Sequence, residues 1–132
     1  MPVYFLSIGG PNFIDDETHP AYIQLAKVGR KITSMAKPKA VVVFSAHWQD
    51  GPNRVSINVA EKADLIYDFY GFPEHYYKVD FPNKGSPEVA KKVIGKLERA
   101  GIEVKRVGRG LDHGVWAGFV AGQSSSALQT FQ

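Results

Sequence analysis

The run from Ala40 to Ser45, which reads AVVVFS, is the feature that most constrains the fold of this chain. Its β-branched and aromatic side chains favour a strand. Because only the last position is polar, we expect a strand that is buried on both faces of a sheet, as happens where helices cover both sides. The segment continues Ala46-His47-Trp48, so an imidazole follows the carboxyl end of the predicted strand.

Two helices are predicted from apolar residues at helical spacing and from residues that start or stop helices. The first has Thr18 or His19 as its N-cap and ends at Lys37-Pro38. The second begins at Ser86-Pro87 and is stopped by Gly101. Three further apolar or alternating segments are predicted strands: Val3–Leu6, Arg54–Val59 and Ile102–Val107. This order predicts one α/β domain with a parallel or mixed central sheet flanked by helices.

Residues 61–83 form a predicted loop that is crowded with aromatic side chains. The loop also contains Gly71, Pro73 and Pro82, and it shows no sustained helix or strand period. A long aromatic loop in a small domain is often a lid or a binding loop. The alternative is that the rings only pack over an edge of the sheet, and the sequence leaves both interpretations open.

The charge pattern favours a solvated surface rather than a nucleic-acid interface. Lys and Arg total 16 against 13 Asp and Glu, for a formal net charge of +3, and the basic excess lies between Lys84 and Arg109. Several of these basic residues fall on the polar side of the second predicted helix. We therefore expect no nucleic-acid partner.

The composition also limits the cellular setting and the metal chemistry. The chain has no cysteine, so any metal ligand must be His, Asp or Glu. No apolar run approaches membrane-spanning length, and the initial MPVYFLSIGG lacks the basic flank of a signal peptide. We expect a cytoplasmic chain with no membrane partner.

Three unusual segments each follow a predicted strand: Ser7–Pro11, Ser45–Trp48 and Leu111–Gly114. In open α/β sheets, ligands bind beyond the carboxyl ends of the strands. The sequence therefore predicts that these three segments line one pocket.

The histidines differ in how strongly their positions indicate chemistry. His47 fits a metal ligand, a general base or a buried histidine with one hydrogen bond. His113 follows Asp112, which could orient it as a general base, although neighbouring residues in a strand face opposite ways; a turn with a helix-capping Asp is the alternative. We expect His19 to cap a helix and His75 to lie exposed in the aromatic loop.

Five segments in this order carry a resemblance to a known family: FLSIGGPNF, KPKAVVVFSAHWQ, IYDFYGFPEHYYK, FPNKGSPEVA and RGLDHGVW. They resemble the class III extradiol ring-cleavage dioxygenases of the subunit-B type, and most of all the DOPA 4,5-extradiol dioxygenase-like group. The resemblance runs over residues 1–119, and members are longer. It implies that this chain is a truncated version of the family's single α/β domain, with residues 120–132 an unrelated, disordered tail.

The resemblance also implies an activity and a site. Members open a catechol ring with dioxygen at a mononuclear non-haem Fe(II) or Zn(II) site, so the implied substrate is a DOPA-like catechol. His47 corresponds to a metal ligand and His113 to the catalytic acid/base. Ile8 stands in another ligand position, where the family has Ser-His-Gly, and the third ligand belongs to the downstream part that this chain lacks.

These departures from the family pattern lead to two expectations. The chain is expected to be an impaired or inactive dioxygenase, because isoleucine offers no lone pair to a metal. The alternative is a non-catalytic binding or interaction protein derived from the same family. In either case we expect self-association through an unfinished sheet.

Overall fold

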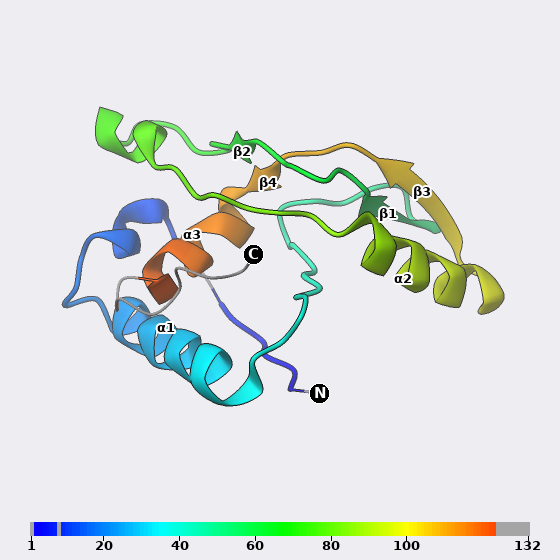
Figure 1. The fold of residues 1–132 in the computed structure, drawn as a ribbon. Helices are drawn as coiled ribbons and strands as arrows, with labels where there is room; N and C mark the ends of the chain where they lie inside the picture. Colours follow the sequence, from blue (N-terminus) through cyan, green and yellow to red (C-terminus); the bar gives the residue numbers. More distant parts are fainter. Residues whose placement is uncertain (1, 8, 124–132) are drawn as a thin grey trace.

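The computed structural model describes residues 2–7 and 9–123 (Figure 1). Its α-helices are α1 (Pro20–Lys31), α2 (Pro87–Arg99) and α3 (His113–Gln123). Its strands are β1 (Arg54–Asn58), β2 (Leu65–Ile66), β3 (Glu103–Val107) and β4 (Leu111–Asp112). Short helical turns are η1 (Pro11–Ile14), η2 (Ile32–Ala36) and η3 (Glu74–Lys78). The predicted α/β class is confirmed.

The strands form two parallel pairs. In each pair, one strand comes from residues 54–66 and the other from residues 103–112. β1 pairs with β3 from Arg54 opposite Glu103 onward, and β2 pairs with β4 from Leu65 opposite Leu111. Because parallel strands cannot be joined by a tight hairpin, the chain must cross over between β1 and β3, and α2 lies in that crossover. The strands predicted around β1 and β3 are therefore confirmed.

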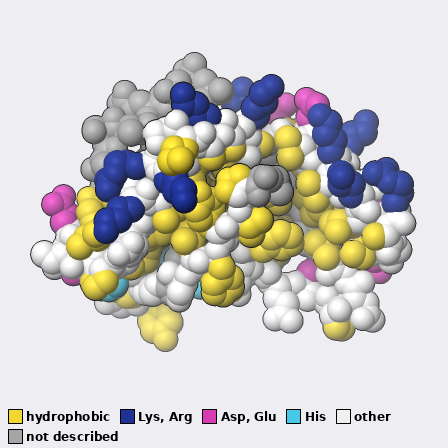
Figure 2. All heavy atoms as spheres, turned by 90° about the horizontal axis from the view of Figure 1, so that it is seen from below, with side chains coloured by type: hydrophobic (Ala, Val, Ile, Leu, Met, Phe, Trp, Pro, Cys, Tyr) yellow, Lys and Arg dark blue, Asp and Glu magenta, His cyan; other side chains and the backbone are white. Residues whose placement is uncertain are grey.

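The strand predictions for Val3–Leu6 and Ala40–Ser45 are wrong. Both segments lie outside the strands of the described structure, and their one backbone hydrogen bond among the described residues is local, from the Trp48 N–H to the Ser45 carbonyl at 3.4 Å. Their side chains are exposed rather than buried, with 98% of Phe5 and 90% of Phe44 accessible. Figure 2 shows hydrophobic side chains spread across the middle of one face, with Lys and Arg near its margins. An apolar run becomes a buried strand only where neighbouring strands pair with it.

The helix ends follow the predicted signals. The His19 ring accepts a hydrogen bond from the Ala21 N–H at 3.1 Å, so His19 caps α1 as predicted. Ser86 caps α2 by accepting a hydrogen bond from the Val89 N–H at 3.3 Å. Gly101 follows α2 with φ of 77°, a left-handed conformation that favours glycine.

The core lies where α1 and α3 pack beneath the β2–β4 pair. The Gly29 Cα position in α1 lies so close to α3 that an added Cβ would stand 2.5 Å from the carbonyl oxygen of Gly122. The two glycines thus let the helix backbones approach. The buried side chains of this core are Phe13, Ile14, Leu25, Tyr76, Trp116, Ala117 and Ala121.

The α3 helix continues past residue 119, where the predicted dioxygenase-like domain ends. Ala121, beyond that boundary, is buried in the core. Residues 124–132 lie outside the described part of the chain, so the predicted tail stays a prediction.

Among the helices of the described residues, none combines the length and the apolar character needed to cross a lipid bilayer.

Candidate functional site

The structure brings two of the three predicted segments together. The rings of His47 and His113 meet edge to face, with centroids 4.5 Å apart. Gly114 allows this approach, because a Cβ at that position would lie 3.0 Å from Cγ of His47. The third segment contains Ile8, which lies outside the described residues, so its predicted place in the pocket stays a prediction.

Asp68 lies between the two imidazoles and bonds to both. Its Oδ2 is 3.0 Å from Nδ1 of His47, and its Oδ1 is 2.8 Å from Nδ1 of His113. The same Oδ1 accepts a hydrogen bond from the backbone N–H of His113 at 2.8 Å. One carboxylate therefore joins two histidines that are far apart in the sequence.

The three side chains differ in burial. The His113 side chain is 8% exposed, whereas those of His47 and Asp68 are 31% and 28% exposed. Burial by itself raises the pKa of the Asp68 carboxyl, but the hydrogen bonds from the backbone and ring of His113 and from His47 lower that pKa to about 2. Asp68 is therefore ionised at neutral pH, and its side-chain oxygens can only accept hydrogen bonds.

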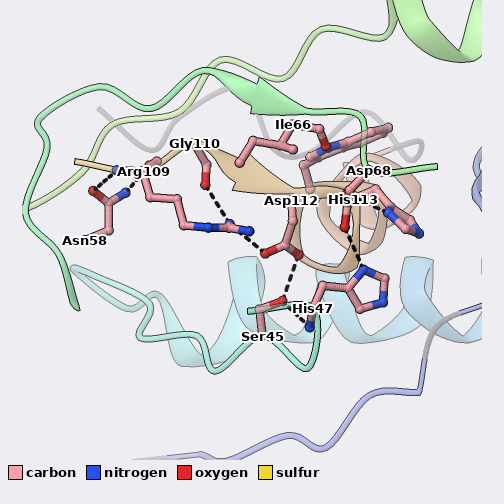
Figure 3. A network of polar contacts seen from close by, with 10 residues as sticks. Ser45, His47, Asn58, Ile66, Asp68, Arg109, Gly110, Asp112 and His113 are labelled. Carbon is pink, nitrogen blue, oxygen red and sulfur yellow. Dashed lines mark hydrogen bonds and ion pairs between the residues drawn. The ribbon is translucent and has the colours of Figure 1, made fainter. Parts of the chain in front are cut away.

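A second network holds the segment that carries His47 (Figure 3). The Ser45 hydroxyl donates a hydrogen bond to Oδ1 of Asp112 at 2.7 Å and accepts one from the backbone N–H of His47 at 3.1 Å. Oδ2 of Asp112 accepts a hydrogen bond from Arg109 at 3.0 Å. Asp112 is almost fully buried, so these hydrogen bonds compensate for the loss of water around its charge.

Asp112 plays neither of the roles that its sequence position suggested. Within the described residues its carboxylate bonds to Ser45 and Arg109, and not to His113 or to the first turn of α3. The side chains of Asp112 and His113 have different partners, as expected for neighbours at a strand end. Asp68, rather than Asp112, is the carboxylate beside His113.

Arg109 extends this second network to Trp48. Its guanidinium lies over the Trp48 ring, 4.9 Å from the ring centroid. Its backbone is tied to Asn58, whose side-chain amide donates to the Arg109 carbonyl at 2.8 Å. The residues on both sides of His47 are thereby attached to the chain that leads into β4.

The aromatic loop closes the other side of the site. Phe69 packs edge-on against the His113 ring, with centroids 5.2 Å apart. Tyr67 packs on Trp116, whose indole N–H donates to the Ile66 carbonyl at 3.0 Å. In contrast, Tyr70 is 92% exposed. The rings of the loop therefore pack into the core and against His113, and a role as a lid or binding loop stays a prediction.

His47, Asp68 and His113 have the chemistry of a metal site. One ligand atom from each residue lies within 4.8 Å of the other two. Within the described residues, this is the one cluster of three or more His, Asp or Glu side chains that could hold a metal ion. Imidazole nitrogens and a carboxylate oxygen are donors that both Fe(II) and Zn(II) accept. The residues present thus fit a divalent transition metal by their donor types.

The other two histidines lie outside this cluster. His19 caps α1, and His75 pairs with Asp15 at 2.9 Å on an exposed surface, both as expected. Asp68 is the site residue that the sequence reasoning missed. It stands between Tyr67 and Phe69 in the aromatic loop, where the local pattern does not distinguish it from a surface carboxylate.

The chain matches a known protein family over most of its length. Residues 2–120 match the family described as the catalytic LigB subunit of aromatic ring-opening dioxygenase. The 4,5-DOPA dioxygenase extradiol of Beta vulgaris is 39% identical over 115 residues, covering 86% of this chain and 42% of that protein. A 4,5-DOPA dioxygenase extradiol-like protein of Schizosaccharomyces pombe is 34% identical, covering 90% and 45%. The Escherichia coli 4,5-DOPA dioxygenase extradiol is 32% identical, covering 88% and 41%, so the chain spans less than half of each relative.

Proposed function

Because the chain belongs to the family of the catalytic LigB subunit of aromatic ring-opening dioxygenase, we propose that its chemistry is extradiol cleavage of a catechol by dioxygen. The observation that carries this proposal is the convergence of His47 and His113 on Asp68. The names of the relatives point to DOPA or a similar catechol as the substrate.

His47 is proposed to hold a mononuclear non-haem metal, either Fe(II) or Zn(II). Its Nδ1 is tied to Asp68, and its Nε2 has no hydrogen-bond partner among the described residues, so Nε2 is the nitrogen available to a metal. When bound, such a metal supplies a Lewis acid that favours the deprotonated form of a catechol hydroxyl.

His113 is proposed to move the proton that a catechol gives up. An imidazole titrates near neutral pH, so it can take and return a proton under physiological conditions. Asp68 stands 2.8 Å from Nδ1 of His113 and stabilises the imidazolium that forms when Nε2 takes a proton. Phe69 covers one side of this ring and limits the access of water.

The activity of this chain is proposed to be impaired by Ile8. The resemblance places a histidine ligand at this position, and an isoleucine side chain has no lone pair for a metal. We expect the third family ligand to lie outside the matched residues. Without a ligand at position 8, the site is then a weak anchor for Fe(II), which stands below Zn(II) in the affinity order.

The test compares the unmodified chain with Ile8→His and with His47→Ala made in each background. Zn(II) binding is measured by titration calorimetry, and oxygen uptake is measured with DOPA and added Fe(II). We expect Ile8→His to bind Zn(II) more tightly than the unmodified chain, His47→Ala to abolish that gain, and oxygen uptake to stay undetected. His47-independent Zn(II) binding would refute the metal role. Oxygen uptake by the unmodified chain that His47→Ala removes would support the site and refute the impairment.

We also propose that two copies of the chain associate through the exposed segment Val41–Phe44. Its side chains are apolar, and its backbone has no hydrogen-bond partner among the described residues. The segment carries no charge, so copies related by a two-fold axis can pair it antiparallel with itself without repulsion. This is the specific observation that favours an interaction role beside the enzymatic one.

The association is tested by sedimentation velocity over a range of protein concentrations. We expect a dimer that Phe44→Lys weakens by at least about tenfold, since a buried charge at a sheet edge opposes pairing. Tyr70→Lys is the matched control, because Tyr70 is as exposed as Phe44 but lies in the aromatic loop. A monomer at all concentrations, or equal effects of the two substitutions, would refute the proposal.

A further inference from the structure

We infer that Asp68 is a positioning residue that sets the same tautomer on His47 and His113, with the hydrogen on Nδ1 and the lone pair on Nε2 of both rings. The inference rests on the proposed function only for the roles of the two rings, His47 as the metal ligand and His113 as the proton carrier. The tautomers themselves are a property of the metal-free chain, so they can be measured whether or not the chain binds a metal.

The inference follows from the arrangement of donors around one acceptor. Oδ2 of Asp68 lies within hydrogen-bond distance of Nδ1 of His47. Oδ1 lies within hydrogen-bond distance of Nδ1 of His113 and accepts a hydrogen bond from the His113 backbone N–H. An ionised carboxylate has no hydrogen to donate. Each ring must therefore place its hydrogen on Nδ1, because any other tautomer would turn a lone pair toward a negative oxygen.

The same arrangement decides which ring nitrogens remain for chemistry. Among the described residues, neither Nε2 atom has a hydrogen-bond partner, so both lone pairs are available. A histidine that binds a metal through one nitrogen commonly donates its other N–H to a carboxylate, which fixes the ring and strengthens the ligand. Asp68 is placed to do this for His47, and it holds the ring of His113, the proposed proton carrier, through the same kind of contact.

The competing role for Asp68 is that of a direct metal ligand. Oδ1 already accepts two hydrogen bonds, so a metal at Oδ1 would compete with an N–H donor of His113, while Oδ2 faces the Nδ1 of His47. The loop contact of Phe69 with the His113 ring keeps that imidazole beside Asp68. The geometry therefore favours a carboxylate that orients ligands over one that replaces them.

The first test is nitrogen-15 NMR of the imidazole rings in the metal-free chain at pH 8, where two-bond correlations show which ring nitrogen carries the hydrogen. His19 is an internal reference, because its Nδ1 accepts a hydrogen bond from Ala21 and its hydrogen must be on Nε2. We expect His47 and His113 to show the opposite tautomer from His19. An Nε2–H tautomer at either site residue would overturn the inference, and this measurement needs no substitution.

The second test uses Asp68→Asn with Asp80→Asn as its control. The asparagine amide has one oxygen acceptor and one NH₂ donor, so it can accept from only one Nδ1–H and turns an N–H toward the other ring. We expect at least one ring to change its tautomer in Asp68→Asn. Asp80→Asn removes the same charge from the same loop, and the Asp80 side chain has no hydrogen bond or ion pair among the described residues, so both rings should stay unchanged there. Unchanged rings in Asp68→Asn would refute a positioning role.

The third test is Zn(II) affinity in the Ile8→His background, measured by titration calorimetry. Removing a carboxylate that orients a ligand typically weakens metal binding about 10–100-fold. We expect Asp68→Asn to fall in that range, while His47→Ala abolishes binding. A loss in Asp68→Asn as complete as that in His47→Ala would make Asp68 a direct ligand, and no loss would leave it without influence on the site.

Discussion

The two parallel strand pairs lie along the same segments of chain but pack against different partners. The β1–β3 pair is the longer, with five residue pairs in register, and the helix α2 that covers it contributes Ala90 and Ile94 as its buried apolar side chains. The β2–β4 pair has only two residue pairs, yet it adjoins α3 with the fully buried Trp116. Figure 1 shows α1 and α3 on the β4 side of the molecule and α2 beside β1 and β3.

Strand length therefore does not decide where the core and the site form. Around β2 and β4, two helices and the aromatic loop converge, and the site carboxylate Asp68 comes directly after β2. Around β1 and β3, the side chains include exposed ion pairs such as Arg106 with Glu98. Buried apolar area outweighs exposed ion pairs, which are worth about 0–1 kcal/mol each.

The largest expected effect is that of Trp116→Ala, which removes a fully buried ring and its hydrogen bond to Ile66. We expect the free energy of unfolding to fall by about 3–5 kcal/mol. Ile94→Ala in α2 should cost less, toward the lower end of about 2–5 kcal/mol. Tyr70→Ala is the control for loss of an exposed ring, because Tyr70 is 92% exposed, and it should stay within about 0.5 kcal/mol. Urea denaturation measures all three, and a larger loss in Ile94→Ala would break the comparison.

The second effect concerns the network that fastens the His47 segment to β4. Ser45→Ala removes a hydrogen bond to the buried Asp112 and one from the His47 backbone. We expect a loss of about 1–3 kcal/mol, because a buried acceptor loses one of its partners. Ser34→Ala is the control, since the Ser34 hydroxyl bonds only to a carbonyl on an exposed turn. Equal losses in the two variants would show that Asp112 does not hold this segment.

The third effect compares helical glycines on the two sides. An added Cβ at Gly29 would clash with the Gly122 carbonyl oxygen, whereas at Gly95 it would meet only the end of the Arg99 side chain at 3.5 Å. We expect Gly29→Ala to destabilise the fold by about 1–3 kcal/mol. Gly95→Ala should instead stabilise it by up to about 1 kcal/mol through helix propensity. Thermal unfolding followed by circular dichroism distinguishes the two signs.

The smallest effect is a pH dependence on the β1–β3 side. Hydrogen bonds from Arg54 and Ser56 hold the pKa of Asp50 well below its ordinary value of 3.8. A carboxyl with a lowered folded-state pKa stabilises the fold fully above its unfolded pKa, and that contribution is lost progressively as the pH falls from the unfolded pKa through the folded-state pKa. We therefore expect Asp50→Asn to reduce stability most at pH 6, and the destabilisation to shrink progressively as the pH falls below about 4. A larger destabilisation by Asp50→Asn at low pH than at pH 6 would contradict this role of the Asp50 carboxylate.

The fold could be predicted in those parts where local signals are strong. Pro20 and Pro87 begin their helices with a capping residue before each, and the α/β order was readable from the alternation of periods. The prediction failed at Val3–Leu6 and Ala40–Ser45, where composition favours a strand but no described segment supplies the pairing partner. Strand propensity depends on the neighbours as much as on the residues themselves.

The candidate site was predictable only in part. The positions of His47 and His113 after apolar runs, together with the motifs around them, made both candidates from the sequence. Their contact with each other and the second network through Ser45 and Arg109 join residues that are far apart along the chain. Contacts of this kind leave no periodic trace in the sequence.

The helices α1 and α2 with their capping residues, the strands β1 and β3, and the family motifs that carry His47 and His113 were all predictable from the sequence, whereas α3 was not. These depend on interactions between near neighbours, which any short window of residues contains. Only the tertiary structure decided that Asp68 bonds to both histidines, that Asp112 serves Ser45 and Arg109, and that the apolar run at Val41–Phe44 is exposed. The physical reason is that hydrogen-bond partners and burial are settled by which distant segments pack together, and packing is a property of the whole fold.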